Sequence, residues 1–111
     1  MDSDLRAELV LRCVECIPSG EAVSYGDIAG IVGTGPRVVG RIMATFGSGV
    51  AWWRVTNAKG ELPSALLPRA RPRWEAEGLS LATNERGINL RKHRANLTDL
   101  EAAWQKRTAE L

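Results

Sequence analysis

Histidine and cysteine, two residue types that often carry catalysis, are scarce in this chain. His93 is the only histidine, so a site built from several histidines is excluded. Cys13 and Cys16 form a Cys-x-x-Cys pair, a spacing found in redox and zinc sites. No second pair accompanies them, and both fall on the apolar stripe of a predicted helix, so we interpret them as a buried structural pair. His93 lies in the basic run 91–94, where a solvated surface or a phosphate contact is the expected role.

Basic side chains are concentrated in two parts of the sequence. The net charge is only +2, but residues 28–60 contain four basic side chains and no acidic one. Residues 69–94 hold seven basic side chains against three acidic ones, whereas residues 1–27 are acidic. This sorting suits one face to a polyanion, and it equally suits an ordinary solvated surface. The arginines at positions 69, 71 and 73 could extend such a face or lie in a solvated loop.

The composition is that of a folded protein. The chain has 111 residues, of which 44% are hydrophobic and 25% charged, so we expect a single domain over residues 1–111. No apolar run approaches the roughly 20 residues that cross a bilayer, and the acidic start is unlike a signal peptide. We therefore expect a cytoplasmic monomer, nucleoid-associated if bacterial, with no cofactor, no bound metal and no membrane partner.

Three helices are expected in the first half of the chain. The apolar spacing predicts a helix over residues 4–17. Ser24 is expected to cap a second helix, with Asp27 completing a capping box, and Gly33 to end it. Pro36 suits the first position of a third helix. Two short helices joined by a glycine-containing turn form a helix-turn-helix pattern over about 24–46.

The second half is expected to contain strands and loops. Residues 50–56 are rich in β-branched and aromatic side chains and predict a strand that could carry a pocket. Residues 63–73 hold three of the five prolines and are expected to form an irregular loop. The other expected elements are a turn at 57–60, a helical segment at about 72–78, paired short strands at 79–81 and 88–90, and a terminal amphipathic helix over 97–110.

Four local patterns occur in one order along the chain. They are Ile17-Pro18-x-Gly20, Val23-Ser24-Tyr25-Gly26-Asp27-Ile28-Ala29, Pro36-Arg37-Val38-Val39-Gly40 and Trp52-Trp53-Arg54-Val55. This order resembles the C-terminal DNA-binding domain of the O6-alkylguanine-DNA alkyltransferase family, over roughly residues 5–62. The resemblance implies a mainly helical α+β fold, a winged helix-turn-helix-like DNA-binding domain.

The chain departs from that family where the reaction occurs. Trp52 stands at the position of the alkyl-accepting cysteine, and Trp53 at that of the histidine that activates it. Because alkyl transfer needs a thiolate, we expect no enzymatic activity. Phe46 occupies the position of a family asparagine. This combination resembles the alkyltransferase-like proteins, which implies binding of O6-alkylguanine in duplex DNA, base flipping, and flagging of the lesion to nucleotide excision repair proteins.

The resemblance also implies roles for individual residues. Arg37 would enter the duplex through the minor groove and fill the space of the flipped base, and Tyr25 would help rotate its 3′ phosphate. Trp52 would line the pocket, unless it simply fills it. The implied DNA contacts are Ser24, Tyr25, Thr34, Pro36, Arg37, Gly40, Arg41 and Lys59; the implied lesion pocket is Tyr25, Trp52, Val55 and Leu62; and Trp53 and Arg54 are structural supports. Arg54 is expected to pair with an acidic residue of the C-terminal half.

Two alternatives remain open at this stage. One is a winged-helix DNA-binding module or regulator without lesion specificity, which would prefer certain sequences of undamaged DNA. The other is an active alkyltransferase, which is disfavoured because no cysteine occurs beyond residue 16.

Overall fold

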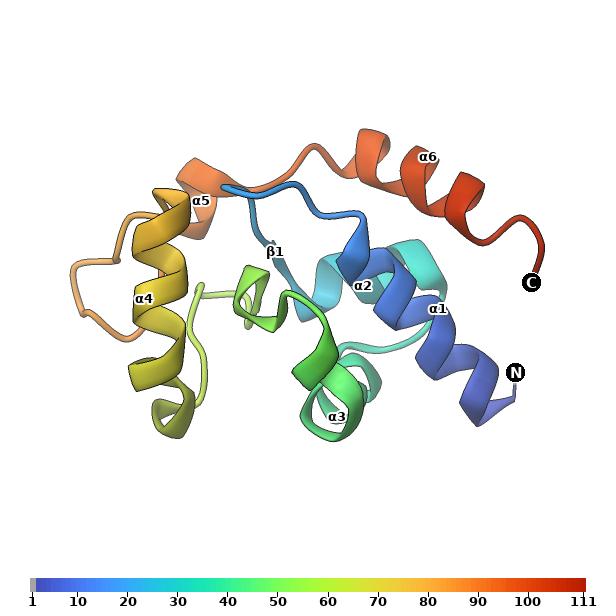
Figure 1. The fold of residues 1–111 in the computed structure, drawn as a ribbon, viewed down its shortest axis with the longest axis horizontal. Coiled ribbons are helices and arrows are strands. Elements are labelled where there is room, and N and C mark those ends of the chain that lie inside the picture. Colours follow the sequence, from blue (N-terminus) through green and yellow to red (C-terminus); the bar gives the residue numbers. More distant parts are fainter. Residues whose placement is uncertain (1) are drawn as a thin grey trace.

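Helices make up most of the fold, and two short strands lie between them (Figure 1). The computed structural model describes residues 2–111. The helices are α1 (Ser3–Glu15), α2 (Tyr25–Val32), α3 (Pro36–Phe46), α4 (Leu67–Glu77), α5 (Leu90–His93) and α6 (Leu97–Arg107); the strands are β1 (Val23–Ser24) and β2 (Val55–Thr56); and 3₁₀ turns are η1 (Gly47–Gly49), η2 (Trp52–Arg54) and η3 (Ser64–Leu66). No helix in the described part of the chain is long and apolar enough to cross a bilayer.

Two apolar clusters hold the helices together. The larger one lies among α1, α2, α3 and α6, at one end of the elongated molecule in Figure 1, and its centre is formed by fully buried valines and isoleucines such as Val10, Ile28 and Val39. The helix α6 joins this cluster through Leu100, and Trp104 donates its indole N–H to the Leu9 carbonyl at 2.9 Å. The smaller cluster surrounds Trp74 beneath α4.

The helix pair α2–α3 forms where local signals predict it. The Ser24 hydroxyl accepts the N–H of Asp27 at 3.1 Å, and the Asp27 carboxylate accepts the N–H of Ser24 at 2.9 Å, so the predicted capping box is confirmed. Gly33 ends α2 with φ +88°, a left-handed conformation that a side chain disfavours. Pro36 lies in the first turn of α3, where its missing N–H costs nothing.

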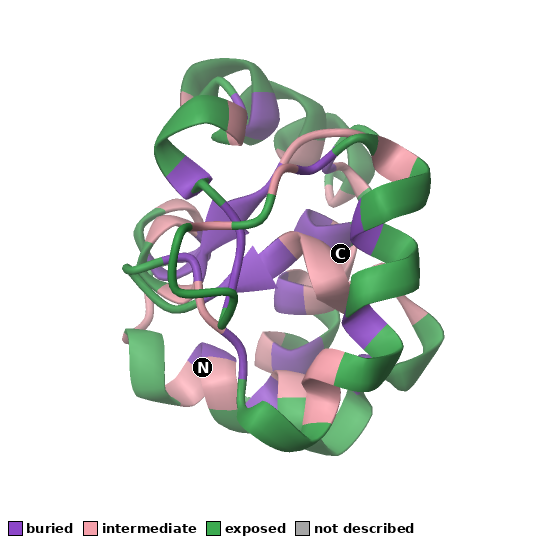
Figure 2. Cartoon of the chain, turned by 90° about the vertical axis from the view of Figure 1, so that its left-hand side faces the viewer, coloured by how far each residue is buried: buried purple, intermediate pink, exposed green. Residues whose placement is uncertain are grey.

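The two strands connect the helix pair to the second half of the chain. β1 and β2 run parallel, with Val23 opposite Val55 and Ser24 opposite Thr56. Figure 2 shows this pair buried among the helices, and all four residues are buried. Because β1 leads directly into α2, the pairing places the residues around β2 beside the start of that helix.

The expected strand over residues 50–56 is wrong for most of its length. Only Val55–Thr56 is a strand, and the turn η2 covers Trp52–Arg54. Successive side chains of a strand point to opposite faces. Trp52 and Trp53 both pack against the cluster around Trp74, an arrangement that a 3₁₀ turn permits.

The expected loop over residues 63–73 is also wrong, because α4 begins at Leu67. Pro68 falls in the first turn, where proline is tolerated, and Pro72 removes one backbone hydrogen bond within the helix. Burial of Ala70 and Trp74 on the same helix offsets that loss. The paired strands expected at 79–81 and 88–90 are reduced to a single antiparallel bridge between Leu81 and Ile88.

Candidate nucleic-acid interface

A cavity of about 210 Å³ opens between α3, the turn η2 and the start of α4. Pockets for drug-sized ligands span roughly 300–1,000 Å³, so this one suits a smaller ligand. Its lining residues are Tyr25, Gly40, Met43, Ala44, Gly47, Ser48, Trp52, Val55, Leu62, Pro63, Leu66 and Arg69. The structure therefore brings together all four side chains predicted to line one pocket.

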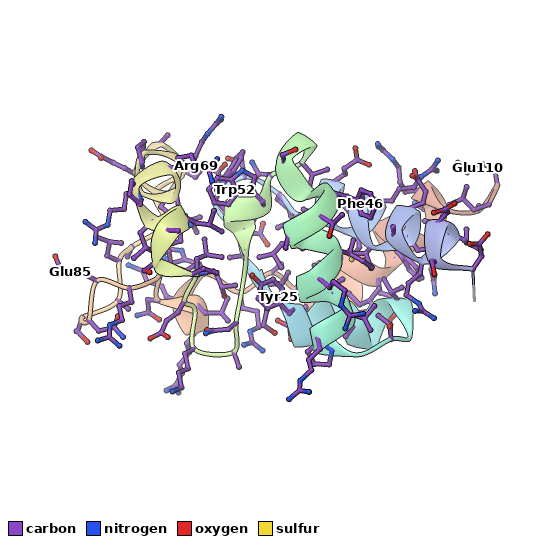
Figure 3. All side chains as sticks on the ribbon, turned by 90° about the horizontal axis from the view of Figure 1, so that it is seen from below. Tyr25, Phe46, Trp52, Arg69, Glu85 and Glu110 are labelled. Carbon is purple, nitrogen blue, oxygen red and sulfur yellow. The ribbon has the colours of Figure 1, made fainter. Side chains whose placement is uncertain are left out.

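The wall formed by Trp52 combines an aromatic face with a cation. The Trp52 ring lies edge-on to Trp53, with 5.8 Å between ring centroids and 85° between planes. The Arg69 guanidinium lies 5.8 Å from the Trp52 centroid, and Figure 3 shows the two side chains together beside α4. An aromatic ring and a planar cation can both stack on a flat ligand.

Sequence reasoning missed Arg69 as a pocket residue because residues 63–73 were expected to form a loop. On a helix, positions 69, 73 and 77 share one face, and that face meets the turn η2. The four-residue spacing of Arg69, Arg73 and Glu77 could have indicated this surface. Met43, Gly47 and Ser48 were missed as well, because nothing in the sequence places the end of α3 beside Trp52.

Tyr25 is half-buried at the first position of α2 and contributes to the same cavity. Burial raises the pKa of its phenol above the ordinary value. The hydroxyl therefore stays protonated at neutral pH and can donate a hydrogen bond to an anionic oxygen.

The outer surface of α3 carries exposed arginines beside small residues. Arg37 and Arg41 are exposed, and within residues 2–111 neither takes part in an ion pair. Pro36 is exposed and Thr34 half-buried at the start of this surface. An added Cβ at Gly40 would meet no atom within 4 Å, so internal packing does not require a glycine there.

Two residues predicted to contact DNA lie apart from this surface. Ser24 is only 5% exposed, and its hydroxyl is occupied by the capping box, so its role in this structure is to start α2. Lys59 is exposed on the turn after β2 and borders a separate groove. Phe46 is 55% exposed and is not among the residues lining the cavity; Figure 3 shows it on the side of α3 nearer α1.

Arg54 and Glu77 form the main ionic contact behind the cavity. Arg54 Nη2 lies 2.8 Å from Glu77 Oε2, and Arg54 Nη1 donates to the Ile17 carbonyl at 2.9 Å. Glu77 also accepts the Trp53 indole N–H at 2.8 Å and the Gly20 N–H at 3.0 Å. The acidic partner expected for Arg54 is thus present, and this contact joins α4 to the segment after α1.

Glu77 titrates below its ordinary range. Burial alone raises its pKa, but the hydrogen bonds from Arg54, Gly20 and Trp53 outweigh burial, so the pKa is lowered overall. The carboxylate is therefore ionised at neutral pH and keeps its contacts with Arg54.

Trp53 is held from several sides. The Arg73 guanidinium lies 4.6 Å from its ring centroid, and that of Arg54 lies at 5.5 Å. The Trp53 carbonyl accepts the indole N–H of Trp74 at 2.7 Å. Since Trp53 does not line the cavity, its contacts fix the turn that carries Trp52.

The cysteines and the histidine lie away from the cavity. Cys13 is buried, and burial, with a smaller effect of Cys16, raises its pKa to about 12. Cys16 is half-buried, and its pKa is also raised, mainly by burial. His93 is half-buried, and its Nε2 accepts the N–H of Ser80 at 3.0 Å.

Comparisons with known proteins agree on one family. Residues 6–79 match the family model of the 6-O-methylguanine DNA methyltransferase DNA-binding domain. A "DNA base-flipping protein" of Vibrio parahaemolyticus is 32% identical over 91 residues, which cover 77% of this chain and 90% of that protein. A protein of the same name from Escherichia coli is 33% identical over 93 residues, covering 78% of this chain and 71% of that one.

A solved structure gives the same result for the fold. The crystal structure of S. pombe Atl1 in complex with damaged DNA containing O6-carboxymethylguanine matches with a TM-score of 0.76 and 31% sequence identity. The match covers 86% of this chain and 99% of that one. The predicted mainly helical α+β fold of a DNA-binding domain is confirmed by these matches.

Proposed function

The chain belongs to the family of the 6-O-methylguanine DNA methyltransferase DNA-binding domain, and we propose that it binds O6-alkylguanine in duplex DNA, flips the damaged base into the cavity beside Trp52, and leaves the alkyl group in place. Relatives named for base flipping support the flipping step. The solved relative bound to damaged DNA supports the choice of lesion.

The observation that carries this proposal is the cavity itself. It opens beside the small residues Gly40, Ala44 and Ser48 of α3 and η1. Trp52 closes one side without filling it, since about 210 Å³ remains open. O6-methylguanine has lost its N1 proton and carries an apolar group at O6, so a wall that is largely apolar suits it.

Retention of the alkyl group follows from the residues around the cavity. Neither cysteine lines it, and both thiols have raised pKa values, so neither offers a thiolate to a base held there. The indole of Trp52 is not a nucleophile for alkyl transfer. We propose that the persistent complex is what nucleotide excision repair proteins recognise.

Three parts of the surface have distinct roles in the proposal. Arg37, exposed in the first turn of α3, replaces the extruded base in the stack. Tyr25 donates its hydroxyl to the phosphate beside the flipped nucleotide. Gly40 has no side chain, so the backbone of α3 can approach the floor of the minor groove closely.

A paired titration tests lesion recognition. Two duplexes of one sequence, one with a single O6-methylguanine and one with guanine, are titrated at a fixed salt concentration. We expect clearly tighter binding of the modified duplex, and Tyr25→Phe is expected to reduce that preference. Salt is held constant because phosphate contacts make both affinities depend on it.

Equal affinity for the two duplexes would contradict the proposal. Such a result, together with a preference among undamaged sequences and no effect of Tyr25→Phe, would favour a DNA-binding module without lesion specificity.

A further inference from the structure

A second concave surface includes the turn that follows β2 and shares no lining residue with the cavity. It is an open groove of about 600 Å³, lined by Ala58, Lys59, Ala82, Thr83, Ile88, Asn89, Leu90, Arg91 and Arg94. Three of these side chains are basic and none is acidic. We call this surface the basic groove.

The charges of the basic groove are largely unpaired. Within residues 2–111, neither Lys59 nor Arg91 takes part in an ion pair, and both are exposed. Arg94 contacts Asp27 at 3.4 Å, a long contact that leaves its side chain 42% exposed. The groove therefore carries more positive charge than the contact with Asp27 neutralises.

The basic groove is joined to the cavity by short backbone connections. Val55 and Leu62 line the cavity, and Lys59 lies on the turn between them. Arg94 reaches Asp27, two residues beyond Tyr25, and its backbone forms a parallel bridge with Ala22 just before β1. These connections place Lys59 and Arg94 within a few residues, or one side-chain contact, of the segments that carry cavity residues.

We propose that the basic groove binds backbone phosphates of the duplex next to the nucleotide that is flipped into the cavity. This inference rests on the proposed function, because it places the duplex against α3 and Tyr25. Lys59, Arg91 and Arg94 supply charge, and Thr83 supplies a hydroxyl that can donate to a phosphate oxygen. Such contacts position the duplex and do not read the lesion.

A nucleic-acid backbone fits the groove better than an acidic protein does. Lys59, Arg91 and Arg94 supply the positive charge of the groove, and no acidic side chain lines it. No aromatic residue lines the groove, and its two larger apolar residues, Ile88 and Leu90, are buried, so it offers no large exposed apolar side chain to a protein partner.

The salt dependence of binding tests this proposal on the full chain. Affinities for the modified and unmodified duplexes are measured at several salt concentrations for the wild type and for Lys59→Ala/Arg91→Ala. Each phosphate contact contributes about −0.9 to the slope of log affinity against log salt concentration. The slope of the double variant should therefore be less steep than that of the wild type by about 1.8. Its affinity should fall by the same factor for both duplexes.

The matched control is Lys92→Ala/Lys106→Ala. These exposed lysines do not line the groove, so the control removes the same net charge at other places. Its slope should stay near the wild-type value. Thermal unfolding of each variant checks that the fold is retained.

Several results would overturn the proposal. They are an unchanged slope in the groove variant, an equal loss in the control, or a loss confined to the modified duplex. An unchanged slope would leave an acidic protein as the partner of the groove. If the wild type shows no lesion preference but the slope still falls in the groove variant alone, the proposed function fails while the phosphate contacts stand.

Discussion

Glu77→Ala is expected to lower the free energy of unfolding by about 3 kcal/mol, at the lower end of the range for breaking a buried ion pair. Both side chains of the pair are largely buried, with Glu77 11% and Arg54 17% exposed. The substitution leaves the Arg54 guanidinium, the Trp53 indole N–H and the Gly20 N–H without their acceptor. Urea unfolding measures the effect through the transition midpoint.

Glu75→Ala is the matched control, because Glu75 is an exposed carboxylate on the same helix. We expect that variant to stay within about 0.5 kcal/mol of the wild type. Equal losses of unfolding free energy in the two variants would show that the contact between Arg54 and Glu77 does not stabilise the packing of α4 against η2 and the segment after α1.

The same contact makes stability depend on pH. Because folding lowers the pKa of Glu77, its carboxylate contributes stability that is fully present above the unfolded pKa. That contribution is lost as the pH falls through the folded pKa. The stability difference between the wild type and Glu77→Gln should therefore shrink on acidification.

Arg37→Ala is expected to weaken binding of the modified duplex by about tenfold or more, which corresponds to about 1.4 kcal/mol. The exposed guanidinium would otherwise stack in the space left by the flipped base and offset part of the cost of unstacking. Because Arg37 is exposed and unpaired within residues 2–111, the substitution should leave the unfolding midpoint unchanged. The decisive quantity is the ratio of the affinities for modified and unmodified duplexes.

Arg41→Ala provides the comparison, since Arg41 has the same charge and lies one turn further along α3. Loss of a phosphate contact at Arg41 should lower the affinities for the modified and unmodified duplexes by the same factor, so their ratio should stay unchanged. Arg37→Ala should lower that ratio, and Arg37→Lys should restore it only in part. If Arg37→Ala behaves like Arg41→Ala, Arg37 contacts phosphate and does not enter the stack.

The helix pair could be predicted from the sequence because its boundaries depend on local interactions. The capping box of Ser24 and Asp27, the left-handed Gly33 and the first-turn Pro36 each act within a few residues. The pocket side chains Tyr25, Trp52, Val55 and Leu62 followed from a family resemblance, and the structure brings all four to one cavity.

The parts that sequence reasoning missed depend on contacts between distant segments. Residues 50–54 have strand propensity, but packing of Trp52 and Trp53 against α4 selects a turn. The prolines of α4 suggested a loop, yet burial of Trp74 stabilises a helix that contains Pro72. Arg69 reaches the cavity only because that helix exists.

The central claim is that this chain holds an alkylated base without removing its alkyl group. The most direct test incubates excess protein with a duplex carrying one O6-methylguanine, at a concentration that saturates binding, and then recovers both components. Nucleoside analysis of the DNA and the intact mass of the protein are measured together. We predict that the duplex returns with its O6-methylguanine intact and that the protein mass is unchanged; guanine restored in the duplex, or a protein heavier by a methyl group, would contradict the claim.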